Sequence, residues 1–334
     1  MSRKISHSII NGRTGAGTGG QGLKVEWVDS NDGQLHWMDV DESSLVPVYW
    51  YGGRGIFAGG WLDSDSGSNV IDYITIASTG NATDFGNSTI SDGYHGGCSN
   101  GTRGVFGGSR NSTNVIYYIT ISTTGDATDF GDLSVGRSTP AAVSNGTRGV
   151  WGGGYAGGYS NVIDYVIIST TGNATDFGDL TAGMSSINGV SNGTRGCMGG
   201  GDRGGVATNV IEYITIASTG NAADFGDLTA SRQAAGATSD DTRGIFGGGS
   251  SATTNIMDYI TIASTGNATD FGDLTVARSD NDACSDNTKG VWGGGFGGSS
   301  KNTLDYVTIQ TTGNAVDFGD LTQARRQISS TSGD

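Results

Sequence analysis

Oxygen-bearing side chains alternate along residues 63–69, where the sequence reads Asp-Ser-Asp-Ser-Gly-Ser-Asn. Carboxylate and hydroxyl oxygens in such an order are typical of calcium-binding loops. The stretch lacks the third acid and the bidentate Glu of an EF-hand loop. A loop that carries protein contacts is therefore the favoured interpretation, and calcium binding by Asp63 and Asp65 is left as an open alternative.

Histidines and nucleophiles give no catalytic pattern. The three histidines, His7, His36 and His95, do not stand at ligand spacing from one another. We interpret His95 as a structural residue whose ring nitrogens are satisfied within the fold. The sequence contains no Gly-x-Ser-x-Gly and no phosphate-binding loop, so it predicts no catalytic residue, metal or cofactor and favours a protein that is not an enzyme.

Composition excludes further classes of partner. The chain has 18 Lys and Arg against 33 Asp and Glu, a formal net charge of −15, which disfavours binding to nucleic acid. No apolar run is long enough for a signal peptide or a membrane-spanning helix. We therefore expect synthesis in a reducing cytoplasm without membrane insertion, with Cys98, Cys197 and Cys284 as free, buried thiols.

Glycine makes up 61 of the 334 residues, against an ordinary share of about 7%. An internal repeat explains this excess. The tripeptide Asp-Phe-Gly recurs at intervals of 45, 47, 48, 46 and 47 residues, with a Tyr twelve residues before each Phe. The six Phe residues are Phe85, Phe130, Phe177, Phe225, Phe271 and Phe318.

Each repeat predicts four short strands. In the third repeat these are Ala141–Ser144, Arg148–Gly153, Asn161–Ile168 and Ala174–Leu180, separated by Asn-Gly and Thr-Gly-Asn turns and one variable loop. No segment has a sustained helical period. Four antiparallel strands repeated six times predict an all-β, six-bladed propeller over residues 46–334.

The two ends of the repeat region predict how the ring closes. The chain stops after one further innermost strand, within residues 325–333, and we expect this strand to pair with Gly55–Gly59. The competing donor is Val46–Tyr51, just upstream of the same segment.

Strand alternation places the first and third turns of every repeat on one face, and these turns hardly vary. They bring a basic residue and the Asp of Asp-Phe-Gly near the same face, so we predict a structural ring of ion pairs. Its members are Arg54, Arg103, Arg148, Arg195, Arg243, Lys289, Asp84, Asp129, Asp176, Asp224, Asp270 and Asp317.

The second turn of every repeat lies on the opposite face and differs in each copy. Residues on loops that a rigid scaffold carries commonly bind partners, although unselected loop drift would give the same variation. The candidate contact residues are Trp61, Asp63, Arg110, Tyr155, Tyr159, Asp202, Arg203, Phe296 and Lys301.

The first 45 residues lie outside the repeat. Residues 1–22 are Gly-rich and predict an extended anchoring arm. Alternating residues on both sides of Asp29–Gly33 predict a β-hairpin within 23–45 that bears Trp27 and Trp37.

The Gly-Gly pairs, the later Tyr and the Phe beyond it resemble a kelch repeat, in which Trp usually stands where this chain has Phe. The wording Asn-Val-Ile-Asp-Tyr-Ile-Thr-Ile and Gly-Asn-Ala-Thr-Asp-Phe-Gly-Asp-Leu-Thr is similar to kelch-like proteins encoded by bacteriophages of aquatic bacteria. This resemblance implies a non-enzymatic virion protein: a tail fibre, receptor-binding tip or head decoration. Residues 1–45 would then bind other virion proteins in an oligomeric assembly, and the variable loops would bind a host-surface glycan or protein. A soluble lectin-like propeller and a glycan-cleaving propeller enzyme are the alternatives.

Overall fold

The computed structural model describes residues 23–28, 35–40 and 53–333, in two compact units, Met1–Val48 and Tyr49–Asp334. In the first unit, β1 (Leu23–Val28) and β2 (Leu35–Val40) pair antiparallel, as the alternation around Asp29–Gly33 predicts. The predicted arm over 1–22, residues 41–45 and the competing closing strand Val46–Tyr51 lie outside the described residues. No helix in the described ranges could cross a membrane.

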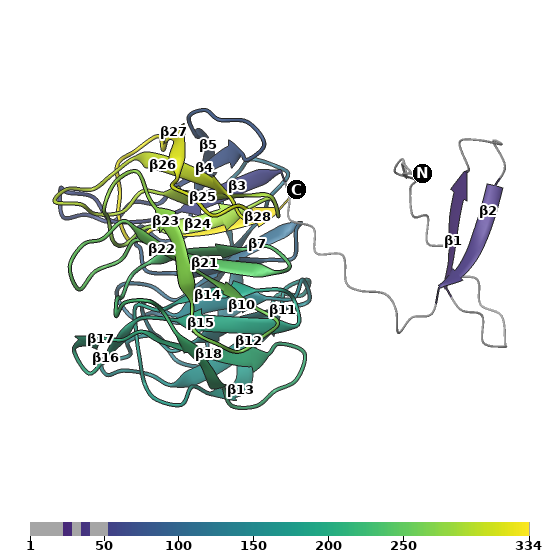
Figure 1. The fold of residues 1–334 in the computed structure, drawn as a ribbon, viewed down its shortest axis with the longest axis horizontal. Helices are drawn as coiled ribbons and strands as arrows, with labels where there is room; N and C mark the ends of the chain where they lie inside the picture. The colour runs from purple at the N-terminus through teal and green to yellow at the C-terminus, as the bar shows by residue number, and fades with distance from the viewer. Residues whose placement is uncertain (1–22, 29–34, 41–52, 334) are drawn as a thin grey trace. The chain divides into compact units, whose positions relative to one another are not determined.

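Six four-stranded antiparallel sheets make up the second unit and succeed one another around a common axis (Figure 1). This is the six-bladed propeller that the repeat predicts. A two-stranded hairpin, β16 (Asp202–Arg203) with β17 (Val206–Ala207), extends the variable loop of blade 4. From the innermost strand outward, blades 1 to 6 are β28 (Ser329–Gly333), β3 (Arg54–Ala58), β4 (Val70–Thr75), β5 (Thr83–Asn87); β6 (Gly96–Ser99), β7 (Arg103–Gly107), β8 (Val115–Thr120), β9 (Thr128–Asp132); β10 (Ala141–Ser144), β11 (Arg148–Gly152), β12 (Val162–Ile167), β13 (Thr175–Asp179); β14 (Asn188–Ser191), β15 (Arg195–Gly199), β18 (Val210–Thr215), β19 (Ala223–Asp227); β20 (Gly236–Ser239), β21 (Arg243–Gly247), β22 (Ile256–Thr261), β23 (Thr269–Asp273); and β24 (Asp282–Ser285), β25 (Lys289–Gly293), β26 (Thr303–Thr308), β27 (Val316–Asp320).

The C-terminal strand closes the ring. β28 pairs antiparallel with β3, with Ser329 opposite Ala58 and Gly333 opposite Arg54. The predicted pairing of the chain's end with Gly55–Gly59 is confirmed, although the strand begins at Ser329 rather than near residue 325. Blade 1 therefore takes its strands from both ends of the repeat region.

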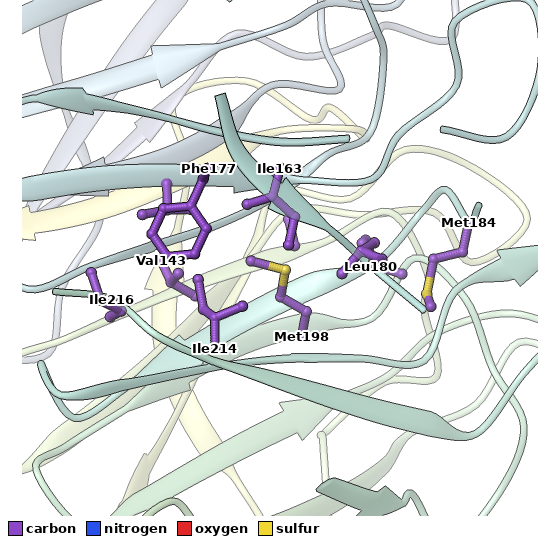
Figure 2. Close-up of a cluster of buried hydrophobic side chains, with 11 residues drawn as sticks. Val143, Ile163, Phe177, Leu180, Met184, Met198, Ile214 and Ile216 are labelled. Atoms are coloured by element: carbon purple, nitrogen blue, oxygen red, sulfur yellow. The ribbon is translucent and has the colours of Figure 1, made fainter. Parts of the chain in front are cut away.

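Apolar side chains fill each junction between neighbouring blades. Figure 2 shows the junction of blades 3 and 4, where Ile163 and Phe177 from blade 3 meet Met198 and Ile214 from blade 4. Similar clusters occupy the other five junctions. A Cβ added to Gly152 would lie 2.5 Å from Sδ of Met198, so the glycine lets the two blades approach as the sequence predicts.

Buried ion pairs cross four of the six junctions. At each of them an arginine from the connection after one blade reaches an acid on the third strand of the next blade, and both side chains are almost fully buried. A β-bulge next to the acid recurs in the outer strand pair of each blade and re-aims its side chain. The pairs are Arg137–Asp164, Arg232–Asp258, Arg278–Asp305 and Arg325–Asp72.

The two remaining junctions change both positions together. Between blades 1 and 2, Asp92 stands in the arginine position and Tyr117 in the acid position. Between blades 3 and 4, Met184 replaces the arginine, and Glu212 instead pairs with Arg203 of its own blade at 3.4 Å. Glu212 thus keeps a cation, whose loss is costly in a low-dielectric interior, whereas the buried Asp92 accepts hydrogen bonds from Gly93 and Asn111 instead.

The Thr-Gly-Asn turns clasp neighbouring blades. The Gly266 amide donates to the carbonyl of Phe225 at 2.8 Å, and the Ala268 amide donates to that of Asp227 at 2.7 Å. The Asp227 amide donates in return to Oδ1 of Asn267 at 3.1 Å. The same contacts link blade 6 to blade 1, where Gly80 donates to Phe318. These hydrogen bonds between blades give a structural reason why the turn and the outer strand hardly vary among the repeats.

Gly226→Ala should destabilise the propeller at this clasp. Gly226 has a φ of +148°, and its Cβ would lie 2.4 Å from the carbonyl oxygen of Gly266. We expect the free energy of unfolding to fall by about 2 kcal/mol or more. Gly220→Ala is the matched control, because Gly220 has a φ of +158° and open space around it. Equal melting temperatures for the two variants would contradict the clasp.

Candidate functional site

The face with the first and third turns of every repeat, which hardly vary, is called the invariant face. It carries the basic residues of the Thr-Arg-Gly turns. The Arg148 guanidinium lies 4.5 Å from the ring centroid of Tyr165 and donates through Nη1 to the carbonyl of Ile216 in the next blade at 3.2 Å. The same ring and carbonyl contacts recur at Arg54, Arg103, Arg195, Arg243 and Lys289.

These contacts take the place of the predicted ion-pair ring. Within residues 53–333, no ion pair joins these basic side chains to the carboxylates of Asp-Phe-Gly. Phe177 is buried on the side of the strand that meets Tyr165 and Arg148, so the adjacent Asp176 points to the other side. All six of these aspartates are exposed: Asp84, Asp129, Asp176, Asp224, Asp270 and Asp317.

On the opposite face, the variable loops are tied to the axis at their bases. We call this surface the variable face and define it by residues 61–69, 109–113, 155–160, 202–208, 250–254 and 296–301. Isolated β-bridges join Trp61 to Arg326, Tyr155 to Ser138 and Phe296 to Ser279. In each case the second residue precedes one member of a ring around the axis.

This axial ring consists of one residue from each blade connection, all with left-handed backbones at φ between 54° and 67°. Its members are Tyr94, Thr139, Ser186, Ala234, Asp280 and Gln327. Each backbone amide donates a hydrogen bond of 2.7–3.0 Å to an oxygen of the preceding member. The acceptor is the backbone carbonyl in five cases and the hydroxyl of Thr139 for Ser186, and the Tyr94 amide closes the circle on the carbonyl of Gln327. Left-handed non-glycine residues are strained and collect at functional sites.

The predicted contact residues of blades 6, 1 and 2 form stacked pairs. The Arg110 guanidinium lies 3.8 Å from the ring of Trp61. Arg326, which the sequence interpretation missed, lies 4.9 Å from the ring of Phe296 and 3.0 Å from a carboxylate oxygen of Asp63. Planar cations stacked on aromatic rings make a rigid surface that suits recognition.

Asp63 is engaged within the protein. Ser300 donates to its carboxylate through the hydroxyl at 2.7 Å and through the backbone amide. These hydrogen bonds and the charge of Arg326 hold the pKa of the Asp63 carboxyl below its usual value. Asp65 accepts a hydrogen bond from Nε1 of Trp61 at 3.2 Å. The Asp63 oxygens thus bind the loops of blades 1 and 6 to each other, and Asp65 accepts a hydrogen bond within its own loop.

A second group lies on blades 3 and 4. Tyr155 is 43% exposed, and its ring meets that of Tyr159 edge to face at 5.7 Å. Partial desolvation and the Asp202 carboxylate raise the pKa of the Tyr159 phenol. Arg203, whose side chain is 38% exposed, also reaches the buried Glu212. Lys301 lies near Ser299, with Nζ 3.4 Å from its hydroxyl.

A pocket opens at the axial ring, with about 360 Å³ of empty space, part of it open to solvent. Its wall combines the ring with residues immediately after it, including His95, Asn281 and Ile328. At the opposite end of the axis, serine hydroxyls donate to the carbonyl of the serine in the preceding blade, as Ser144 does to Ser99. The pocket therefore belongs to the variable face.

Buried polar groups of this pocket have no protein partner. Both ring nitrogens of His95, Oδ1 of Asn281 and Oε1 of Gln327 form no hydrogen bond within the described chain. The prediction that the nitrogens of His95 are satisfied is wrong. Burial lowers the pKa of His95 to about 3, so its imidazole is neutral, with one donor and one acceptor. Burial raises the pKa of Tyr94 to about 12, and the negative charge of Asp280 contributes to this rise.

Asp282, on the innermost strand below this pocket, should make stability depend on pH. Its Oδ2 accepts from the Ser330 amide at 2.7 Å, but desolvation raises its pKa to about 7, against about 3.9 when unfolded. The folded state thus binds the extra proton between these values, and its stability falls as pH rises through this window. Asp282→Asn should flatten that part of the profile in thermal melts. An Asp282→Asn profile parallel to that of the unaltered chain from pH 4 to 8 would contradict the assignment.

Comparison with protein-family models and with curated proteins gives no match to this chain.

Proposed function

We propose that the chain is a non-enzymatic structural protein of a bacteriophage virion, of the kelch-like type that its repeats resemble. In this proposal it is a tail fibre, receptor-binding tip or head decoration, and its variable face recognises the host surface. Residues 1–45 attach it to other virion proteins within an oligomeric assembly.

One observation carries the proposal: the two faces use their loops differently. The turns of the invariant face clasp neighbouring blades, as at Gly226 and Gly266, so their sequence is constrained by the fold. The loops of the variable face differ in every blade and present stacked pairs such as Trp61 with Arg110. A scaffold that fixes one face and varies the other is suited to recognition.

Substitution on the variable face tests this proposal. Tyr155→Ala with Tyr159→Ala should weaken adsorption of the full chain to bacterial cells and their purified surface polysaccharides by about tenfold or more. The melting temperature should change little, because Tyr155 is exposed. Val316→Ala is the control, since Val316 is 55% exposed on β27, away from the variable loops. Unchanged adsorption of the double variant would contradict recognition by this face.

A soluble lectin-like propeller is the second candidate, and the aromatic side chains of the variable face favour it. The two candidates differ in what residues 1–45 do. For a virion protein, deletion of these residues should abolish incorporation into particles and leave adsorption of the free chain intact. For a soluble lectin, the same deletion has no such effect.

A further inference from the structure

Arg110, on the variable loop of blade 2, differs from the other arginines of the propeller. Six of these pair with a carboxylate: Arg137, Arg203, Arg232, Arg278, Arg325 and Arg326. The other five donate to backbone carbonyls on the invariant face, as Arg148 does. Within residues 53–333, the exposed side chain of Arg110 forms neither an ion pair nor a hydrogen bond. Its charge and its N–H donors are therefore available to a ligand.

The surroundings of Arg110 hold its guanidinium in place. The group lies 3.8 Å from the ring centroid of Trp61, and the Arg110 backbone amide donates to the carbonyl of Gly93 at 2.9 Å. The next residue is fixed as well, because the backbone amide and the side chain of Asn111 both donate to the Asp92 carboxylate. A cation on such a fixed loop loses little conformational entropy when it binds a ligand.

The carboxylates beside this stack limit which anion can bind. Asp92 accepts from Asn111, and Asp65 accepts from Nε1 of Trp61, so neither is paired with Arg110. Their charges and the net charge of −15 disfavour ligands with dense negative charge. One carboxylate is enough for one guanidinium, and the two planar groups match as a bidentate pair. An anion with isolated carboxylates therefore fits this site best.

The neighbouring loop adds an open aromatic ring. The Ser112 hydroxyl donates to the carbonyl of Tyr155 at 3.0 Å, which joins the loops of blades 2 and 3. Tyr155 is 43% exposed, and within residues 53–333 no cation covers its ring as Arg110 covers that of Trp61. Such a ring can stack on the C–H face of a sugar. A cation and an open ring on adjoining loops suit a glycan that carries carboxylates.

We propose that Arg110 binds the carboxylate of a uronic acid residue in a surface polysaccharide, while Tyr155 stacks on another sugar of the same polysaccharide. This inference rests on the proposed recognition of a cell surface and names the class of polysaccharide that the variable face takes. Recognition of the charge falls to Arg110, because Arg203 and Arg326 are already paired with acids.

Calorimetric titration of the full chain with three probes tests the proposal: tetragalacturonate, the same oligosaccharide with its carboxyl groups reduced to alcohols, and inorganic phosphate. Tetragalacturonate should bind, and the reduced form should bind at least about tenfold more weakly because it lacks the charge. Affinity for tetragalacturonate should also fall as salt is added. Equal affinity for the reduced form, stronger binding of phosphate, or no binding of tetragalacturonate at millimolar concentration would overturn the assignment.

Substitutions of Arg110 isolate the guanidinium. Arg110→Met removes the cation and should lower the affinity for tetragalacturonate about tenfold or more, whereas Arg110→Lys, which keeps the charge without the planar fork, should restore only part of it. The melting temperature should hold, because Arg110 is exposed. Lys289→Gln is the matched control, since it removes the same charge from the invariant face and should leave the affinity unchanged. An unchanged affinity of the Arg110→Met variant would overturn the role of Arg110.

Adsorption to cells separates this inference from the proposed function on which it rests. If Arg110→Met adsorbs normally while the Tyr155 and Tyr159 double variant does not, the uronic acid assignment fails and recognition by the variable face stands. If neither variant loses adsorption, both proposals fail.

Discussion

Truncation of the chain after Ile328 is expected to abolish cooperative folding. The missing strand, β28, supplies the innermost ladder of blade 1. In this strand the carbonyl of Ser332 accepts a hydrogen bond from the Ser99 hydroxyl, and the Ser330 amide donates one to the Asp282 carboxylate. Without it the ring is open, the edge of β3 is unpaired, and apolar clusters on both sides of blade 1 meet water. Circular dichroism melts should lose their sharp transition, and the truncated chain should bind hydrophobic dyes.

A peptide spanning residues 325–334, added in trans, is the control for this truncation. Because it can add as a strand to the exposed edge of β3, it should restore part of the transition. A truncated chain that melts within a few degrees of the full chain would contradict C-terminal closure. It would instead favour Val46–Tyr51, the alternative that the sequence left open.

Arg278→Met is expected to lower the free energy of unfolding by about 3–5 kcal/mol, because it leaves a buried carboxylate without its cation. Arg278 and Asp305 are both 0% exposed and lie 3.0 Å apart. Methionine already occupies this repeat position at Met184, so its shape is compatible with a junction. Denaturant titration measures the loss, and the exposed Arg110→Met should cost less than about 0.5 kcal/mol.

The double variant Arg278→Met with Asp305→Asn tests whether the loss comes from the stranded charge. It should recover about 1 kcal/mol or more of the single variant's loss, although Asp305 also accepts from the Thr275 hydroxyl at 2.5 Å. A single variant that costs less than about 1 kcal/mol, or a double variant that is no better, would contradict this interpretation.

Much of the architecture could be predicted from the repeat, because each copy repeats the same local signals. In the third blade the predicted strands differ from the observed ones by at most one residue at each end: Ala141–Ser144 is identical, and Asn161–Ile168 is observed as Val162–Ile167. Asn-Gly and Thr-Gly turns fix where strands end. Closure could be predicted because residues 325–333 match the innermost strand of a repeat, and blade 1 has no such strand of its own next to β3.

The contacts between blades could not be predicted in the same way. Arg137 and Asp164 stand 27 residues apart in different blades, and no local pattern links them. A signal was present, since an acid precedes the third-strand Tyr in five copies and Arg occupies the partner position in four. Asp92 and Met184 replace Arg at that position in the other two copies. The joint occurrence of the acid and the arginine at these two repeat positions predicts the pairs.

The candidate site was predicted in part. Loop variation led to Trp61, Arg110 and Phe296, but not to Arg326, because Arg326 lies in a blade connection rather than in a variable loop. The axial ring left no sequence pattern, since its six members are of six residue types. What they share is a backbone conformation, which only the structure reveals.

Hydrogen exchange on the full chain bound to the surface polysaccharide that adsorbs it best tests the central claim most directly. The account predicts protection of the variable face, above all residues 61–69, 155–160 and 296–301, with unchanged exchange at the Asn-Gly and Thr-Gly turns. Protection confined to those turns, with the variable loops exchanging as in the free chain, would contradict it.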